Sequence, residues 1–264
     1  MIDGERTSDG VIPMVCMMTN ADELIAAARI LSEQVSGLRF GRPVSHVYNP
    51  LEYARIPHEE YLRRYGQGRK QAVFLGMNPG PFGMVQTGIP FGDVAMARDW
   101  LKISAQVEKP ACEHPRRPVE GFGCRRSEVS GQRLWSTIAA QFRTPERFFR
   151  KFFVANYCPL AFMEKSGRNL TPDKLTGPVP EQLFAFCDRH LERVARILQP
   201  HWVIGIGRFA AKRAEKALAG TGFRIGWILH PSPANPMANR NWAETVSAEL
   251  IGLGVCGHGG AGPA

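Results

Sequence analysis

The stretch QAVFLGMNPGPFGM, residues 71–84, decides how this chain folds. It begins with a short apolar run, Gln71–Leu75, and continues into a Gly/Pro-rich loop that extends from Gly76 to Gly92. A brief apolar run that ends at Gly and Pro is typical of a buried strand that feeds a loop. Three more runs of this kind follow, at Phe152–Asn156, Trp202–Ile206 and Phe223–Leu229.

Segments with helical periodicity alternate with these four strands. We expect helices at Ala21–Leu31, from Pro57 to just before Gly66, and at Val94–Ser104, Val129–Phe142, Glu181–Leu198, Arg208–Leu218 and Asn239–Leu253. Gly41–Pro50, Lys109–Arg126 and Lys165–Pro180 are predicted to be connectors or loops. Short apolar strands that alternate with helices predict an α/β fold, with a mostly parallel sheet covered on both faces. In such sheets ligands bind at the carboxyl ends of the strands, where the unusual loops of this chain lie.

The length of 264 residues fits one large domain or two small ones. The sequence contains no internal repeat and no linker that would separate two domains. We therefore expect a single domain at residues 20–253, a flexible leader at 1–19 and a flexible Gly-rich tail at 254–264.

Charge suggests the class of partner. Lys and Arg exceed Asp and Glu by a net charge of +9. A surplus of this size favours a polyanion such as nucleic acid, although a basic protein without an anionic ligand remains an alternative. No apolar run reaches the roughly 18–20 residues that cross a bilayer, so we expect no membrane association.

The cysteines favour free thiols in a reducing compartment. None of the six forms a C-x-x-C pair, although Cys112, His114 and Cys124 are close in sequence. We therefore predict neither a metal site nor another cofactor from their spacing.

Three strand-end loops carry candidate functional residues. The first, Gly76–Met84, lacks the Gly-Lys-Ser/Thr of a phosphate-binding loop and contains two prolines, which donate no amide hydrogen bond. It holds Asn78 at a strand end, and Phe91 follows shortly after. Asn156 ends the second strand and His230 ends the fourth. Each of these residues alone is as well explained by a structural role.

The loops together resemble one family. GMNPGPFGM at 76–84, PFG at 90–92, NYCPL at 156–160 and HPSP at 230–233 resemble the single-strand-selective monofunctional uracil-DNA glycosylases, and the resemblance extends from about Val47 to Leu253. It implies a three-layer α/β/α sandwich with a short, mostly parallel central sheet. It also implies flipping of uracil and 5-modified uracils, such as 5-hydroxymethyluracil, out of single- and double-stranded DNA. Water then hydrolyses the N-glycosidic bond, which leaves an abasic site without strand cleavage and without a cofactor.

The resemblance assigns roles to matching residues. Asn78 would position the water and His230 would stabilise the departing base as catalytic residues. Asn156 would recognise the base, and Phe91 would stack on it. The remaining pocket residues would be Met77, Gly80, Phe82 and Met84, with Gly80 beside the 5-position.

Contacts with DNA would come from the last loop and from basic residues. The last-loop candidates are Ser232, Pro233, Ala234 and Asn235, and the phosphate-contact candidates include Arg126, Lys165 and Arg168. For these charges, a solvated loop is the alternative. The family commonly carries a long basic side chain where this chain has Ala234, which puts duplex penetration in doubt unless Arg240 compensates. We expect a monomer that acts inside the cell, where its DNA lies.

Two other functions stay open at this point. One is a superfamily glycosylase with shifted purine or mismatch specificity. The other is a catalytically weak protein that binds damaged or single-stranded DNA with the same pocket.

Overall fold

A parallel sheet forms the centre of the computed structural model, which describes residues 18–255. Its strands are β2 (Ala72–Gly76), β3 (Phe152–Asn156), β6 (Trp202–Ile206) and β7 (Arg224–Ile228), in the order β3-β2-β6-β7, and every neighbouring pair is parallel. The predicted α/β class and the four strand positions are confirmed. All five residues of β2 are buried, as expected for a central strand that is covered on both faces.

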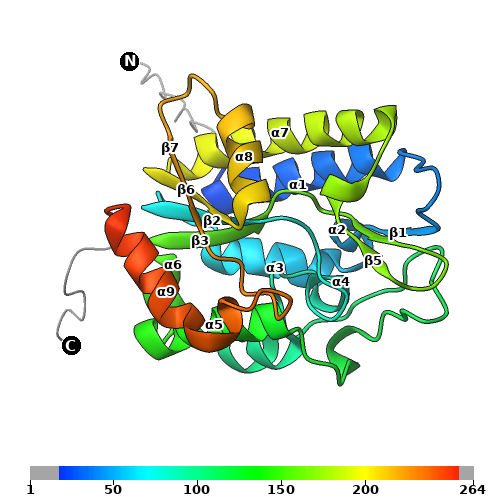
Figure 1. The fold of residues 1–264 in the computed structure, drawn as a ribbon, viewed down its shortest axis with the longest axis horizontal. Helices are drawn as coiled ribbons and strands as arrows, with labels where there is room; N and C mark the ends of the chain where they lie inside the picture. Colours follow the sequence, from blue (N-terminus) through cyan, green and yellow to red (C-terminus); the bar gives the residue numbers. More distant parts are fainter. Residues whose placement is uncertain (1–17, 256–264) are drawn as a thin grey trace, which may run out of the picture.

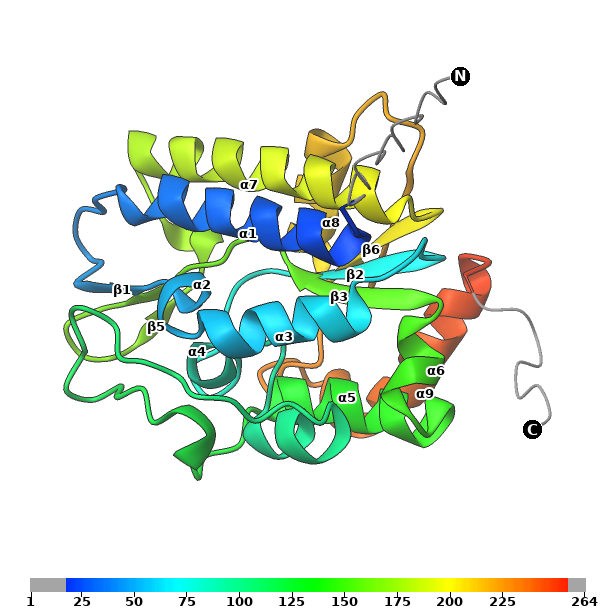
Figure 2. The ribbon, with the colours of Figure 1, turned by 180° about the vertical axis from the view of Figure 1, so that it is seen from behind.

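Helices cover the two faces of this sheet. Figures 1 and 2 show α1 (Asn20–Ser36), α7 (Pro178–Leu198) and α8 (Arg208–Ala217) on one side, and α5 (Val129–Phe142), α6 (Pro145–Phe149) and α9 (Ala238–Gly252) on the other. This is the predicted three-layer arrangement. No helix within residues 18–255 is long and apolar enough to cross a membrane.

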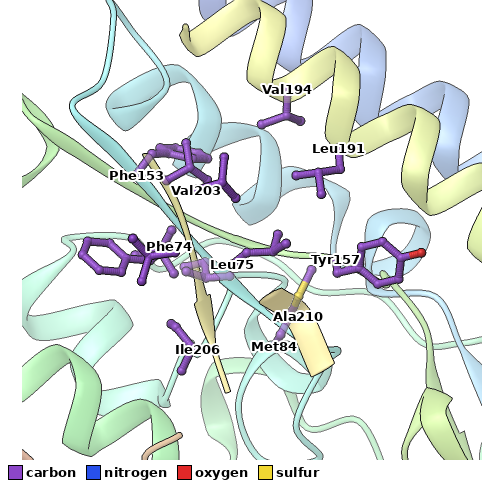
Figure 3. Close-up of a cluster of buried hydrophobic side chains, with 14 of the residues drawn as sticks. Phe74, Leu75, Met84, Phe153, Tyr157, Leu191, Val194, Val203, Ile206 and Ala210 are labelled. Atoms are coloured by element: carbon purple, nitrogen blue, oxygen red, sulfur yellow. The ribbon is translucent and has the colours of Figure 1, made fainter. Parts of the chain in front are cut away.

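The core lies between these layers. The positions of α7 that recur every three or four residues, Leu183, Cys187, Leu191, Val194 and Leu198, are all buried. Figure 3 shows Leu191 and Val194 on the side of the strands to which Phe153 and Val203 point, with Phe74 and Ile206 on the opposite side. This alternation is the period of two expected of strands buried on both faces.

A second, small sheet was not predicted. It consists of β1 (His46–Tyr48), β4 (Ala161–Met163) and β5 (Asn169–Leu170), in the antiparallel order β1-β4-β5. The expectation that Gly41–Pro50 and Lys165–Pro180 contain no strands was therefore wrong. Strands of two or three residues are too short to show periodicity, and β1 pairs with a segment far along the chain.

Helix boundaries also differ from the expectation. The segment predicted as a helix at Val94–Ser104 contains a π-helical turn at Met96–Trp100, and the chain turns at Lys102, where φ is 56°. The structure also contains short helices that were not predicted, namely α2 (Pro50–Tyr53), α4 (Met84–Thr87) and the 3₁₀ turns Gly121–Gly123 and Pro172–Lys174. The helix predicted near Pro57 is α3 (Arg55–Tyr65).

Contacts with the packed core also involve Thr19 and Val255, which lie just outside the range 20–253. The Thr19 hydroxyl accepts a hydrogen bond from the Asp22 amide and caps α1. Val255 is buried, and its carbonyl accepts a hydrogen bond from Gln71 Nε2 at 2.8 Å. Most of the predicted leader and tail, residues 1–17 and 256–264, lies outside the described residues.

Candidate active site

A cavity of about 300 Å³ opens where β2, β3 and β7 end. It is lined by Met77, Asn78, Pro79, Gly80, Pro81, Met84, Phe91, Glu128, Ser130, Asn156, Asn169, Thr171, His230 and Ser232. The three strand-end loops singled out in the sequence therefore meet at one site, as the topology of a parallel sheet requires.

Asn156 and Phe91 both line this cavity, and they lie close together over Gly76 because Gly76 has no side chain. Gly76 is the register partner of Asn156 across β2 and β3. A Cβ atom at Gly76 would clash with Asn156 Oδ1 and with the Phe91 ring. The Asn156 Nδ2 group donates a weak hydrogen bond to Met84 Sδ at 3.2 Å. Asn156 Oδ1 is buried and accepts no hydrogen bond within residues 18–255. A buried acceptor without a partner is rare and indicates a position that a ligand donor can satisfy.

Phe91 is held in an unusual backbone conformation. Its φ is 55°, in the left-handed region that costs a bulky residue about 1–3 kcal/mol. The Phe91 carbonyl accepts the Asp93 amide at 2.8 Å and packs so closely on Gly131 that a Cβ there would clash. The result places the Phe91 ring 6.1 Å from the His230 ring, between ring centroids, at an interplanar angle of 44°.

Asn78 is tied to the loop that follows β3. Its Nδ2 donates to the Leu160 carbonyl at 3.2 Å. Backbone hydrogen bonds from Tyr157 to Gly76 and from Cys158 to Met77, both 2.9 Å, continue the contact between the two loops beyond the strands. These contacts fix the plane of the Asn78 amide. The hydrogen bond to Leu160 uses Nδ2 and does not involve Asn78 Oδ1.

His230 is a neutral imidazole with a defined tautomer. Its Nδ1 accepts the Ser232 amide at 3.1 Å, so the ring proton lies on Nε2. Burial lowers the pKa of His230 to about 4. At neutral pH the ring therefore presents an uncharged N–H donor.

Glu128 is a site residue that the sequence analysis missed, together with Ser130, Asn169 and Thr171. Asp93 Oδ2 accepts hydrogen bonds from the Ser127 hydroxyl at 2.8 Å and the Glu128 amide at 2.9 Å, and so fixes the start of α5. Burial raises the pKa of the Glu128 carboxyl. Glu128 and Ser130 lie at the start of α5, and Asn169 and Thr171 lie in or directly after β5, a strand too short to give a periodic signal in the sequence.

Phe82 does not line the cavity, contrary to its predicted role as a pocket residue. Its ring lies under the guanidinium groups of Arg126 and Arg117, at 3.9 and 5.3 Å from the ring centroid. Phe82 therefore belongs to a basic surface next to the cavity. The backbone of Phe82, and not its ring, contacts a cavity residue: the Phe82 amide donates a hydrogen bond to Glu128 Oε2 at 3.2 Å.

Buried His114 holds the long basic loop against the hairpin of β4 and β5. His114 Nε2 lies 3.2 Å from the Glu164 carbonyl and 3.3 Å from that of Lys165. Arg117 Nε donates to the Gly167 carbonyl at 2.7 Å. Among the predicted phosphate contacts, Lys165 is exposed, whereas Arg168 pairs with Glu164 at 3.1 Å.

The loop after His230 is braced but presents no basic side chain at Ala234. Arg133 donates to the Pro231 carbonyl at 3.0 Å, and Asn239 donates to the Pro233 carbonyl at 2.8 Å. Ala234 is exposed. Shortly after it, Met237 is 62% exposed, which is unusual for a large apolar side chain.

Comparisons with known proteins agree with this geometry. The family model of the uracil DNA glycosylase superfamily matches residues 63–250. A single-strand selective monofunctional uracil-DNA glycosylase of Rattus norvegicus is 46% identical over 91% of this chain and 87% of its own length. The corresponding protein of Bos taurus is 47% identical over 85% of this chain and 84% of its own length. The crystal structure of wild-type Pedobacter heparinus SMUG2 superposes with a TM-score of 0.65 at 21% identity, and the match covers 91% of this chain and 100% of that chain.

Proposed function

Since the chain belongs to the uracil DNA glycosylase superfamily, we propose that its cavity binds a uracil flipped out of DNA and positions it for hydrolysis. The chain is an enzyme, a monofunctional uracil-DNA glycosylase that acts on an N-glycosyl bond. The finer assignments below extend this class to individual residues, substrates and steps.

The observation that carries the proposal is the unpartnered Asn156 Oδ1 beside the Phe91 ring. Uracil offers a donor at N3–H and an acceptor at O4. Asn156 Oδ1 accepts from N3–H and its Nδ2 donates to O4, while the ring stacks on Phe91. Cytosine inverts both groups and would leave the buried amide unsatisfied, which discriminates strongly between the two bases. The hydrogen bond to Met84 Sδ is weak, so a base oxygen displaces it readily.

His230 supplies the donor for the leaving group. As the bond between C1′ and N1 breaks, negative charge develops on uracil O2. The His230 Nε2–H donates to O2 without losing its proton, since a neutral imidazole is a very weak acid. A preorganised donor of this kind is worth about 3–4 kcal/mol in the transition state.

Asn78 positions the attacking water. Its amide oxygen accepts a hydrogen bond from water, and its orientation is fixed by the bond to Leu160. An amide is too weak a base to form hydroxide. The base therefore departs first, as a uracil anion, and leaves an oxocarbenium-like sugar. Water then adds to C1′, and its proton balances the charge of the uracil released.

Hydrolysis, and not strand cleavage, fits the lining of the cavity. A combined lyase reaction needs an amine that attacks C1′. No lysine is among the residues that line the cavity in the described part of the chain.

The partner in this proposal is uracil-containing DNA, single-stranded by preference. A base in a duplex must first be extruded, at a cost of a few kcal/mol. The exposed Ala234 is too small to push a base out of a duplex. The surface formed by Phe82 and Arg126 favours an unpaired strand, because it offers a stacking partner and a positive charge. We also propose excision of 5-modified uracils by a monomer that acts where the DNA of the cell lies.

The test uses oligonucleotides with uracil, 5-hydroxymethyluracil, hypoxanthine, xanthine or thymine, as single strands and duplexes. Alkali cleaves the abasic sites, and a gel separates the products. We expect uracil to be excised fastest from single strands and no cleavage before alkali. Preference for a purine would contradict the proposal, and so would strand cleavage without alkali. The Asn156→Ala variant is the matched control, because it should lose uracil excision.

A further inference from the structure

Glu128 occupies the place that the sequence assigned to a 5-substituent. An added Cβ atom at Gly80 would lie 2.5 Å from Glu128 Oε2, 2.7 Å from Cδ and 2.8 Å from Oε1. The space beside the Gly80 Cα is therefore filled by a carboxyl group. Both residues line the cavity, so this carboxyl forms part of its wall.

The backbone amides of Phe82 and Gly83 hold this carboxyl, and the hydrogen bond with good geometry is made to Oε2. Glu128 Oε2 accepts the Phe82 amide at 3.2 Å. For Oε1, no donor from residues 18–255 comes within hydrogen-bond geometry, and Oε1 is not sealed in the interior, as unpartnered buried oxygens such as Asn156 Oδ1 are. Oε1 is thus free to interact with an occupant of the cavity.

The position of C5 follows from the other assignments, so this inference rests on the proposed function. Asn156 faces N3 and O4, His230 faces O2, and Asn78 faces the sugar carbon. In the uracil ring, C5 is bonded to C4, the carbon that carries O4, so C5 lies next to the O4 edge. Met84 lies next to Asn156, with its sulfur 3.2 Å from Nδ2; Gly80 precedes Met84 in the same loop, and Glu128, at the start of α5, packs against Gly80. Of the lining residues, the wall formed by Gly80 and Glu128 is the one beside Met84 and therefore next to the O4 edge, so we place C5 against it.

We propose that Glu128 determines which 5-substituent the enzyme accepts, because its free oxygen forms the wall against C5. A hydroxymethyl group donates a hydrogen bond to Oε1, and the ionised acceptor strengthens that bond. The methyl group of thymine would cover Oε1 without offering a hydrogen-bond donor. Oε1 would then lose its hydrogen bonds to water without a replacement, which costs free energy. An anionic carboxyl substituent is repelled.

Two substitutions at Glu128 separate the alternatives. Glu128→Gln keeps the volume and an oxygen for the Phe82 amide but places an NH₂ donor at the free position. Glu128→Met keeps the approximate length and removes both polar atoms. We measure single-turnover excision from single strands that carry uracil, 5-hydroxymethyluracil or 5-carboxyluracil, and we compare each variant with the wild type on the same base. Differences in leaving-group chemistry then cancel.

For Glu128→Gln, we expect excision of 5-carboxyluracil relative to uracil to rise at least about tenfold, since an amide donor replaces a repelling charge. For Glu128→Met, 5-hydroxymethyluracil relative to uracil should fall about tenfold, the effect of one lost charge-assisted hydrogen bond. Glu120→Gln is the matched control: it removes one charge from an exposed residue that does not line the cavity, and it should leave both ratios unchanged.

A merely structural role predicts a different result. If Glu128 only holds the loop through the Phe82 amide, each variant changes excision of all three bases by the same factor, and the inference is overturned. If the wild-type enzyme does not excise uracil, the proposed function is wrong, and the inference about Glu128 that rests on it is wrong as well.

Discussion

In the proposed mechanism His230 and Asn78 are fixed, uncharged groups, and we expect each to contribute strongly to the chemical step. His230→Ala would remove the proposed donor to O2, and Asn78→Ala would remove the group proposed to orient water. We expect each variant to lose at least ~100-fold in single-turnover excision, as for removal of one preorganised group. DNA affinity, measured by fluorescence anisotropy, should stay close to that of the wild type. A near-normal rate in either variant would remove that residue from the mechanism.

Asn156 should account for the choice between uracil and cytosine. Asn156→Asp changes the hydrogen-bonding pattern with almost no change in volume. An ionised carboxylate only accepts, so it repels O4, whereas a protonated one donates to cytosine N3 and accepts from N4. We expect a large loss on uracil and a weak gain on cytosine toward low pH, because burial keeps the acid protonated.

The measurement is single-turnover excision from single strands with uracil or cytosine, between about pH 5.5 and 8, which spans the raised pKa expected of a buried acid. Asn156→Ala is the control, which should lose uracil without gaining cytosine. Wild-type uracil activity in Asn156→Asp across this range would mean that Asn156 has only a structural role.

At the scale of elements, we expect the loop between β7 and α9 to influence the opening of duplex DNA. Its backbone is braced by Arg133 and Asn239, while Ala234 at its surface lacks bulk. We expect Ala234→Arg to raise excision from duplexes, and from U:A most, since U:G is easier to open. Excision from single strands should not change.

The readout is the ratio of duplex to single-strand rates for U:A and U:G substrates. Met237→Ala is the informative companion, because apolar side chains also serve as wedges between bases. An unchanged ratio in Ala234→Arg would show that this loop position does not limit duplex opening.

At the scale of the whole molecule, buried histidines link stability to pH. Burial lowers the pKa of His190, like that of His230, to about 4, and lowers the pKa of His58. The unfolded chain binds protons at these positions below about pH 6.5, whereas the folded chain resists protonation down to about pH 4. The unfolded state therefore gains protons in this window, and the folded state loses stability as the pH falls.

We expect the free energy of unfolding to fall between pH 6.5 and 4 by up to about 3 kcal/mol for each of His190 and His230. Urea unfolding across this window measures the slope. His190→Gln should reduce the slope, since glutamine does not titrate. An equal slope in wild type and variant would contradict a buried, neutral His190.

The sequence by itself determined the central sheet and the main catalytic candidates. Buried strands such as Ala72–Gly76 are short apolar runs between Gly, Pro and polar segments, a signal that is local and strong. Asn156 ends such a strand, Asn78 and His230 lie two residues beyond the ends of two others, and the parallel topology brings these strand ends together. Strand positions plus this rule therefore located the cavity.

Only the tertiary structure decided what lies between those residues. The small sheet of β1, β4 and β5 depends on pairing between distant segments, which leaves no periodic trace in two or three residues. Glu128, for which the sequence predicted no role, lines the cavity, whereas the Phe82 ring packs under Arg126 and the Phe82 amide donates a hydrogen bond to the Glu128 carboxyl. The direction of a side chain in an irregular loop depends on the groups that satisfy its backbone donors, and those groups come from elsewhere in the chain.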